Sequence, residues 1–437
     1  MTQPLKNLWL LGLIGLLAVI GLGASTLLRP VTPAIGNTVS LPCTTPVGGP
    51  LGWTARAAVP SGVEGSTGVI IGDKIYVTHG FIPGDSTITQ IYDIPSNSWD
   101  PPGANASVIR SELAGVCAIE NGVAKVFAIG GRGIDPDIGG PVIDEVEVYD
   151  PGTDSWSARA DMPTARRGLC ATYVPTLGLQ GTIFAVGGGT GGTAPHSGVA
   201  TGANEAYDVA AGAWVAKSAM PTPMMGVYAC VWHPGTGLIY VFGGFDSTAG
   251  AVTDLVQIYN PAADAWLPNG ATMPTARSNA IAGVCGEDIY VIGGLNTGTG
   301  NLTANERYNP VADGWAAGPP LPSSRSELAS TAVSTGLEIY AIGTGAFGVA
   351  GAPHDRFQCA AEPKPTQTPC PTGEKKNPSG CKAVGGISAD GELRALPLDT
   401  SSSSGTDAGL LAGVIAGSSA LALIAGAAWY MRRRWLY

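Results

Sequence analysis

The segment EVYDPGTDSW at residues 147–156 returns four more times, slightly altered, along this chain of 437 residues. The other copies are QIYDIPSNSW, EAYDVAAGAW, QIYNPAADAW and ERYNPVADGW. In every copy Tyr and Trp are seven residues apart: Tyr92 and Trp99, Tyr149 and Trp156, Tyr207 and Trp214, Tyr259 and Trp266, Tyr308 and Trp315. Asp or Asn followed by Pro favours a turn. Each segment therefore predicts a strand, a tight turn and a returning strand.

An apolar run precedes each copy and ends in small residues. The runs are KIYVTHG, KVFAIGG, TIFAVGG, LIYVFGG and DIYVIGG, and a sixth, EIYAIGT, follows the last copy. β-Branched and aromatic residues favour a buried strand, and glycine permits a turn that a Cβ would obstruct. The glycine pairs are Gly130–Gly131, Gly187–Gly188, Gly243–Gly244 and Gly293–Gly294. With the apolar strand after MPTAR, each unit of 50 to 57 residues contains four strands.

This pattern resembles the kelch repeat, whose units are the blades of a β-propeller. The resemblance implies an all-β, six-bladed propeller over residues 51–361, and the departures are His79-Gly80 in the first unit and Gly343-Thr344 in the sixth. The sixth unit has Phe357 in place of Tyr and no Trp after it, whereas Trp53 stands alone near the other end. We therefore expect the N-terminal strand to complete the last blade, because unpaired strand edges would otherwise remain.

The two ends of the chain are apolar, and the net charge is −10. Without a dense basic cluster, the acidic chain argues against a nucleic-acid partner. Residues 408–431 contain no charge and are followed by Arg432, Arg433 and Arg434, which predicts a transmembrane helix with a cytoplasmic tail. The expected order is a signal peptide or signal anchor at 1–28, a lead-in at 29–50, the propeller, a Pro/Thr/Ser/Gly-rich stalk at 362–407, the helix, and a basic tail at 432–437. The propeller would then lie outside the cytoplasm, on a single-pass membrane anchor.

Eight cysteines in an exported chain allow disulfides. A Cys43–Cys359 bridge would close the ring, and Cys370–Cys381 is the simplest local pairing in the stalk, although crossed pairings among these four stay open. Four more cysteines lie in the strand that begins a blade: Cys117, Cys170, Cys230 and Cys285. We expect them to be free cysteines that act as small buried apolar residues rather than as metal ligands.

Four arginines occupy the same point of the connection between blades: Arg110, Arg166, Arg277 and Arg325. Glu112 and Glu327 follow two of them in RSELAGV and RSELAST, and Asn279 has the matching place in RSNAIAG. One interpretation is a mouth of guanidinium groups around the axis that binds carboxylates, sulfates or an acidic peptide. The other is repeat architecture, in which each Arg pairs with a neighbouring loop or with Glu112 and Glu327. The sequence alone leaves both open.

The kelch resemblance implies that the rim of the propeller binds partners. We therefore expect a protein- or glycan-binding module displayed at the cell surface on a membrane-anchored stalk. The alternative is a carbohydrate-active enzyme, since sialic-acid epimerases and galactose oxidase are similar propellers. The four histidines, His79, His196, His233 and His354, form no paired copper motif, so no metal, cofactor or catalytic residue is expected.

Overall fold

In the computed structural model of the chain, the described residues are 52–359, without 62–63, 82–86, 134–139, 193–195, 328–332, 335–337 and 344–350. The expected signal segment, stalk, transmembrane helix and basic tail, with Cys43, Cys370 and Cys381, lie outside them. No helix within the described ranges is long and apolar enough to span a membrane.

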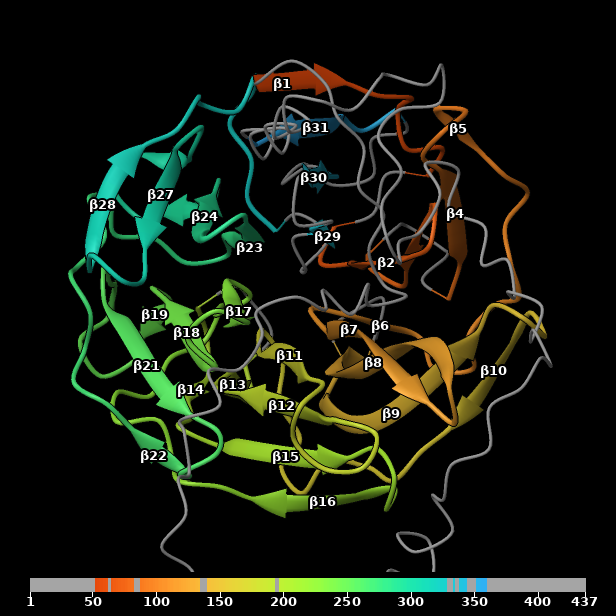
Figure 1. The fold of residues 1–437 in the computed structure, drawn as a ribbon, viewed down its shortest axis with the longest axis horizontal. Helices are drawn as coiled ribbons and strands as arrows, with labels where there is room; N and C mark the ends of the chain where they lie inside the picture. Colours follow the sequence, from red (N-terminus) through yellow and green to blue (C-terminus); the bar gives the residue numbers. More distant parts are fainter. Residues whose placement is uncertain are drawn as a thin grey trace, which may run out of the picture. The chain divides into compact units, whose positions relative to one another are not determined.

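Six antiparallel sheets surround a common centre as the blades of a propeller (Figure 1). Blade 1 has β2 (Thr67–Ile71), β3 (Lys74–Thr78), β4 (Thr89–Asp93) and β5 (Ser98–Trp99). Blade 2 has β6 (Arg110–Ser111), β7 (Ala114–Glu120), β8 (Val123–Gly133), β9 (Val142–Asp150) and β10 (Ser155–Ala158). Blade 3 has β11 (Cys170–Val174), β12 (Thr182–Val186), β15 (Asn204–Asp208) and β16 (Ala213–Ala216).

The remaining three blades repeat this order. Blade 4 has β17 (Cys230–His233), β18 (Leu238–Phe242), β21 (Val256–Asn260) and β22 (Ala265–Trp266). Blade 5 has β23 (Ile281–Cys285), β24 (Asp288–Ile292), β27 (Asn305–Asn309) and β28 (Gly314–Ala317). Blade 6 has β29 (Val333–Ser334), β30 (Glu338–Ile342), β31 (His354–Gln358) and, as its outermost strand, β1 (Gly52–Ala55).

The N-terminal strand closes the ring, as the sequence predicts. β1 pairs with β31 in a register that places Trp53 opposite Phe357, and their ring centroids are 5.1 Å apart. The indole N–H of Trp53 donates to the carbonyl oxygen of Pro319 in blade 5, at 2.8 Å. The six-bladed architecture and its closure are therefore confirmed.

Each repeated Tyr and Trp lie directly opposite one another in the third and fourth strands of a blade, as Tyr149 and Trp156 do in β9 and β10. The hydroxyl of Tyr149 donates to Oδ1 of Asp154 in the turn, at 2.6 Å. The same oxygen accepts the backbone N–H of Ala104 from blade 1, at 2.7 Å, and the indole of Trp156 donates to the Ala104 carbonyl, at 2.9 Å. The repeated segment therefore both folds a hairpin and fixes one blade to the preceding one.

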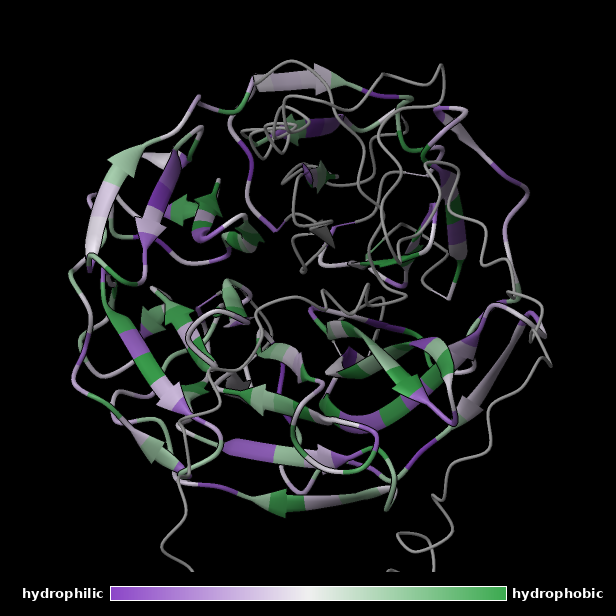
Figure 2. Cartoon of the chain, viewed as in Figure 1, coloured by the Kyte–Doolittle hydropathy of each residue, from purple (hydrophilic) through white to green (hydrophobic). Residues whose placement is uncertain are grey.

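The core lies between blades, where the apolar inner strands of neighbours pack together. Figure 2 shows apolar residues along inner strands such as β12 and β18, and a mixed colouring along outer strands. Phe184 of blade 3 and Tyr259 of blade 4, for example, are buried in one cluster with Ile239. Glycine is needed at the end of the second strand, because a Cβ on Gly131 would lie 2.7 Å from the carbonyl oxygen of Ser111.

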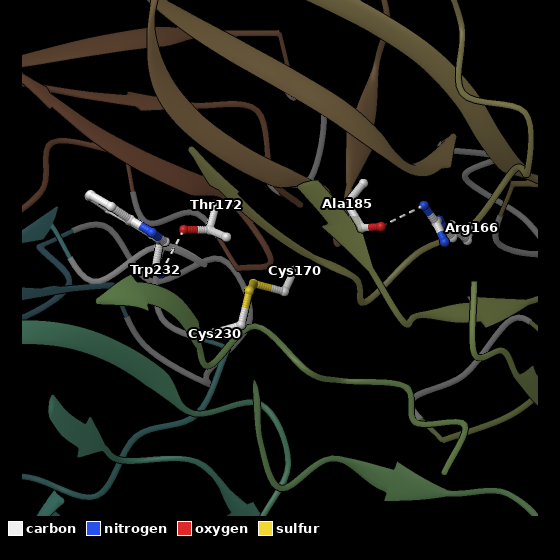
Figure 3. The surroundings of a disulfide bond; sticks show 6 residues. All are labelled: Arg166, Cys170, Thr172, Ala185, Cys230 and Trp232. Carbon is white, nitrogen blue, oxygen red and sulfur yellow. Dashed lines mark hydrogen bonds between the residues drawn. A yellow bond between two sulfur atoms is a disulfide. The ribbon is translucent and has the colours of Figure 1, made fainter. Parts of the chain in front are cut away.

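The disulfides differ from the sequence-based pairing. Cys359 is bonded to Cys285, so the predicted Cys43–Cys359 bridge is wrong. Cys170 is bonded to Cys230 (Figure 3), and Cys117 is also disulfide-bonded. The prediction that Cys117, Cys170, Cys230 and Cys285 are unbonded apolar residues is therefore wrong as well.

The physical reason for the Cys170–Cys230 bond is the convergence of the blades. The innermost strands β11 and β17 approach one another, and the Cα atoms of Cys170 and Cys230 are 5.9 Å apart. That separation is within the range that a disulfide spans. The Cys170–Cys230 and Cys285–Cys359 disulfides each join one blade to the next.

His79 replaces the first glycine of the pair in blade 1, and its ring is buried against Trp156, with centroids 5.2 Å apart. Burial is the main cause that lowers the pKa of His79 to about 4, from an ordinary value of 6.5. Between pH 4 and pH 6.5, His79 is therefore protonated in the unfolded chain and neutral in the folded chain. The stability from this residue is complete above pH 6.5 and decreases as the pH falls toward 4.

We expect the substitution His79→Gly, which restores the glycine pair, to reduce the loss of stability on acidification. The effect should be about 3 kcal/mol between pH 6.5 and 4. Urea denaturation of both proteins at a series of pH values measures it. Equal slopes of unfolding free energy against pH would contradict the buried, neutral state of His79.

Candidate functional site

The four repeated arginines are at most 2% exposed. Each forms an ion pair with an acidic side chain of its own blade: Arg110 with Glu147, Arg166 with Glu205, Arg277 with Glu306, and Arg325 with Asp355. Arg166 also donates to the carbonyl oxygens of Ala185 and Ala203, at 3.1 and 2.9 Å, and Figure 3 shows the first bond. The four guanidinium groups are therefore paired inside their own blades, with acidic residues other than Glu112 and Glu327.

A signal for this role was present in the sequence but was not used. The acidic partners all stand two residues before the repeated Tyr or Phe, as Glu205 stands before Tyr207. Blade 4 has Met224 at the arginine position and Gln257 at the acidic one. The amide of Gln257 instead bonds the backbone of Thr222, at 2.9 and 3.0 Å. Arginine thus occurs only where an acid is present to receive it, which indicates pairing inside each blade.

Two residues after each arginine position, the backbone adopts a left-handed conformation and reaches the centre of the propeller. We call these six residues the axial ring: Gly65, Glu112, Gly168, Gly226, Asn279 and Glu327. Backbone hydrogen bonds connect successive members, for example Gly168 N to Glu112 O at 2.9 Å and Asn279 N to Gly226 O at 2.8 Å. The φ values of Glu112 and Glu327 are 54° and 50°, a conformation that costs about 1 kcal/mol for a residue other than glycine.

A cavity opens at the axial ring, because the ring residues of blades 2 to 6 converge there. Its polar lining consists of Glu112, Arg167, His196, Tyr228, Asn279 and Glu327. The cavity volume is about 10 Å³, which is room for roughly one water molecule. Glu112, Asn279 and Glu327 were predicted as mouth residues, and the structure brings these three together. Arg110, Arg166, Arg277 and Arg325 do not line the cavity.

Carboxyl groups dominate the charge of this cavity. Arg167 forms an ion pair with Glu112, and Arg132 lies 3.4 Å from the other Glu112 oxygen. Glu327 accepts a hydrogen bond from the Asn279 amide, at 2.8 Å, and also contacts the carboxyl of Glu64. Burial, followed by the charges of Glu112 and Glu64, raises the pKa of Glu327 to about 8. Glu327 therefore carries a proton at neutral pH.

The remaining polar residues bound the same cavity. Burial raises the pKa of Tyr228 well above its usual range, so its hydroxyl stays neutral. His196 stacks on Phe245, with ring centroids 4.3 Å apart, and its Nε2 lies 2.8 Å from Oγ of Ser278. Burial and the charge of Arg167 lower the pKa of His196. The cavity beside Glu327 is thus lined by the neutral side chains of Tyr228 and His196 and by Glu112, which is paired with Arg167.

The raised pKa of Glu327 predicts a loss of stability toward alkaline pH. Between its ordinary value of 4.5 and about 8, the folded chain retains a proton that the unfolded chain has lost. The contribution of Glu327 is therefore present at acidic pH and disappears as the pH rises toward 8. We expect Glu327→Gln to flatten the unfolding free energy between pH 5 and 8, measured by urea denaturation. An unchanged decrease would contradict a protonated Glu327.

Short hairpins extend from the same face of the propeller. They connect the second and third strands of blades 3 to 5: β13 (Gly189–Thr190) with β14 (Val199–Ala200), β19 (Phe245–Asp246) with β20 (Ala251–Val252), and β25 (Leu295–Asn296) with β26 (Gly300–Asn301). Each hairpin begins beside the residue that precedes the axial ring, as in the bridges between Arg167 and Gly189 and between Ser278 and Leu295. The first of these hairpins contributes His196, which lies between β13 and β14, to the lining of the cavity.

Sequence reasoning missed Glu64, Arg132, Arg167, Tyr228 and His196. Glu64 and Arg167 directly precede ring positions, and alignment of the repeats on the axial ring would have placed them at the centre. Arg132 lies at the end of β8, His196 lies between β13 and β14, and neither had such a signal. Within the described ranges, no group of three or more His, Cys, Asp or Glu residues could bind a metal ion.

The chain is similar to known kelch proteins. The sequence profile of the kelch motif matches residues 276–322, which contain blade 5. Kelch-like protein terF of Aspergillus terreus is 25% identical over 276 residues, 59% of this chain and 56% of the relative. Human Kelch-like protein 23 is 26% identical over 280 residues, 62% of this chain and 44% of the relative. The chain thus spans about half the length of these relatives.

A solved structure, entitled "Structure of YjhT", has the same fold. Its TM-score is 0.54 at 15% sequence identity, and the match covers 69% of this chain and 95% of that one. At this identity the likeness shows the fold alone. The repeated Tyr and Trp, the six blades, the kelch motif match and the kelch-like relatives agree, and together they support a kelch-repeat β-propeller.

Proposed function

We propose that the propeller is a binding module that contacts a partner protein through the axial face, defined as the hairpins β13–β14, β19–β20 and β25–β26 together with the axial cavity. The observation that carries this proposal is the axial ring. Glu112 and Glu327 occupy left-handed positions where blades 1, 3 and 4 have glycine. Such strained polar residues persist where function requires them. The kelch family, whose members generally bind proteins, supports the same conclusion.

We also propose that the module is displayed outside the cytoplasm on a membrane-anchored stalk. The apolar segments of the sequence at 8–28 and 408–431 support this location. The Cys170–Cys230 and Cys285–Cys359 bonds support it as well, because disulfides persist in oxidising compartments. Of the two expected partner classes, protein and glycan, we favour protein, since a cavity of about 10 Å³ cannot admit a sugar ring.

Two alanines of blade 4 offer a matched test. The N–H of Ala249 donates to Oδ1 of Asp246 in the hairpin of the axial face. The N–H of Ala263 makes the same bond to Asn260 in the turn on the opposite face. Both side chains are exposed. In captures from surface extract with the full chain, we expect Ala249→Arg to lose the partner that wild type and Ala263→Arg retain. Loss with Ala263→Arg alone would contradict the proposal.

A carbohydrate-active enzyme is the second candidate. The observation in its favour is the protonated Glu327 beside Glu64, because a carboxyl group with a pKa near neutrality can serve as a general acid or base. The small cavity volume argues against it. Proton NMR of sialic acid anomers with the full chain separates the candidates. Accelerated interconversion that Glu327→Gln abolishes would establish the enzyme, whereas an unchanged rate would reject it.

A further inference from the structure

The disulfide of Cys117 joins the propeller to a part of the chain outside the described residues. Cys117 is disulfide-bonded, and no described cysteine is free. The other described cysteines bond one another in two pairs, Cys170–Cys230 and Cys285–Cys359. Of the eight cysteines in the chain, three therefore remain as candidates for the partner: Cys43, Cys370 and Cys381.

The order of the cysteines along the chain favours Cys43. Each of the two described pairs joins one cysteine to the next cysteine in the sequence. The same order pairs Cys43 with Cys117 and Cys370 with Cys381. Cys370 and Cys381 are only 11 residues apart, and a short loop costs less entropy to close than a long one. These two cysteines are therefore expected to bond each other, which leaves Cys43 for Cys117.

The position of β1 allows Cys43 to reach blade 2. Gly52 pairs with Gln358, and Gln358 pairs with Glu338 at the start of β30, so β1 begins at the end of blade 6 that is remote from the axial ring. Cys43 precedes Gly52 by nine residues, and nine extended residues reach roughly 30 Å. A blade of four strands is about 14 Å wide. The lead-in can therefore cross blade 6 and continue to an inner strand beyond it.

The inner strands between blade 6 and Cys117 carry apolar side chains that are partly exposed. β2 of blade 1 contacts both β29 of blade 6 and β7 of blade 2. Ile71, at the end of β2, and Cys117 are half-buried and pack against the same apolar cluster. Ile119 lies on the same face of β7 as Cys117 and is also half-buried. The sequence around Cys43, SLPCTTPV, is uncharged and contains apolar residues, so it suits this surface.

We propose that a Cys43–Cys117 disulfide fastens the lead-in across blade 1 to the innermost strand of blade 2. Two thiols lose two protons and two electrons when the bond forms, and the disulfide of a thiol oxidoreductase accepts them by exchange and becomes a dithiol. The proposal does not depend on the axial face as a binding surface.

The consequence of this bond is a stronger closure of the ring. β1 has four residues and completes blade 6 by pairing with β31. The disulfide would hold β1 from its beginning, and the chain that continues into blade 1 holds it from its end. A β1 strand that detaches then stays near β31, so its return is an intramolecular step at high effective concentration.

Peptide mapping of the full chain without reduction tests the pairing. The chain is denatured with its thiols blocked and digested with trypsin, which releases Cys117 in the peptide 111–125. We expect this peptide to be linked to the peptide that ends at Arg56 and contains Cys43. We also expect the peptide 377–382, which contains Cys381, to be linked to 357–375, which contains Cys370. A link from 111–125 to 357–375 or 377–382 would overturn the proposal.

The variants Cys43→Ser and Cys381→Ser are a matched pair for the effect on ring closure, measured by hydrogen–deuterium exchange of β1. We expect Cys43→Ser to free the thiol of Cys117 and to accelerate exchange in β1 roughly tenfold or more. Cys381→Ser should free Cys370 and leave the exchange of β1 unchanged. Exchange in β1 that is equal in wild type and Cys43→Ser, or accelerated equally by both variants, would contradict the fastening of β1 by this bond.

Discussion

Replacement of Arg277 by Met should lower the free energy of unfolding by about 3–5 kcal/mol. The guanidinium of Arg277 is fully buried, and it pairs with Glu306 and donates to the Gly293 carbonyl, at 3.1 Å. Methionine fills a similar volume, so the main effect is a buried carboxylate without its partner. Urea denaturation followed by tryptophan fluorescence measures the loss.

The double variant Arg277→Met, Glu306→Gln should recover most of that stability. Blade 4 already contains this combination as Met224 and Gln257, and the amide of Gln257 bonds the backbone of Thr222. Glu306→Gln alone should also destabilise the chain, because the arginine then remains buried and charged. Additive effects of the two substitutions would contradict a dedicated ion pair inside the blade.

Removal of the Cys285–Cys359 disulfide should cost about 4 kcal/mol in the chain-entropy account. The bond closes a loop with a sequence separation of 74 residues and joins β23 of blade 5 to the end of β31 of blade 6. We expect the Cys285→Ala, Cys359→Ala variant to unfold at lower urea concentration than wild type. The change should exceed that of any conservative surface substitution.

The matched control is the Cys170→Ala, Cys230→Ala variant. Its disulfide closes a separation of 60 residues between blades 3 and 4, so the expected loss is nearly the same. Reduction of wild type should produce a loss at least as large as either pair of substitutions. A change of less than about 1 kcal/mol in both variants would show that the bonds add nothing to inter-blade packing.

The sequence predicted the fold because every repeat contains the same pattern of strands and turns. Tyr149 and Trp156 could be any hairpin pair, but five copies at regular spacing require five similar blades, and Trp53 then has only the sixth blade to complete. Side-chain pairing between blades was less accessible. Linear order predicts that blades 5 and 6 are neighbours, but it does not show that the end of β23 lies beside the end of β31, where Cys285 and Cys359 are bonded.

Only some of the residues at the candidate site could be predicted from the sequence. Glu112, Asn279 and Glu327 were found because the repeat marks their position, whereas the sequence analysis left the environment of the arginines two residues earlier undecided. The residue in the left-handed conformation lies at the axis, whereas the arginine two residues before it is buried inside its blade. The equal spacing of the acidic partners Glu147, Glu205 and Glu306 ahead of the repeated Tyr carries the information that settles the arginines.

Site-specific photo-crosslinking tests the central claim, the use of the axial face by a partner, most directly. A benzoylphenylalanine probe at Val199, which is 65% exposed on the β13–β14 hairpin, reports on this face. Probes at Leu179 and Val311, which are 95% and 82% exposed in turns of the opposite face, are the controls. We predict a cross-linked partner from Val199 and none from the two controls. Cross-links from Leu179 or Val311 without one from Val199 would contradict the account.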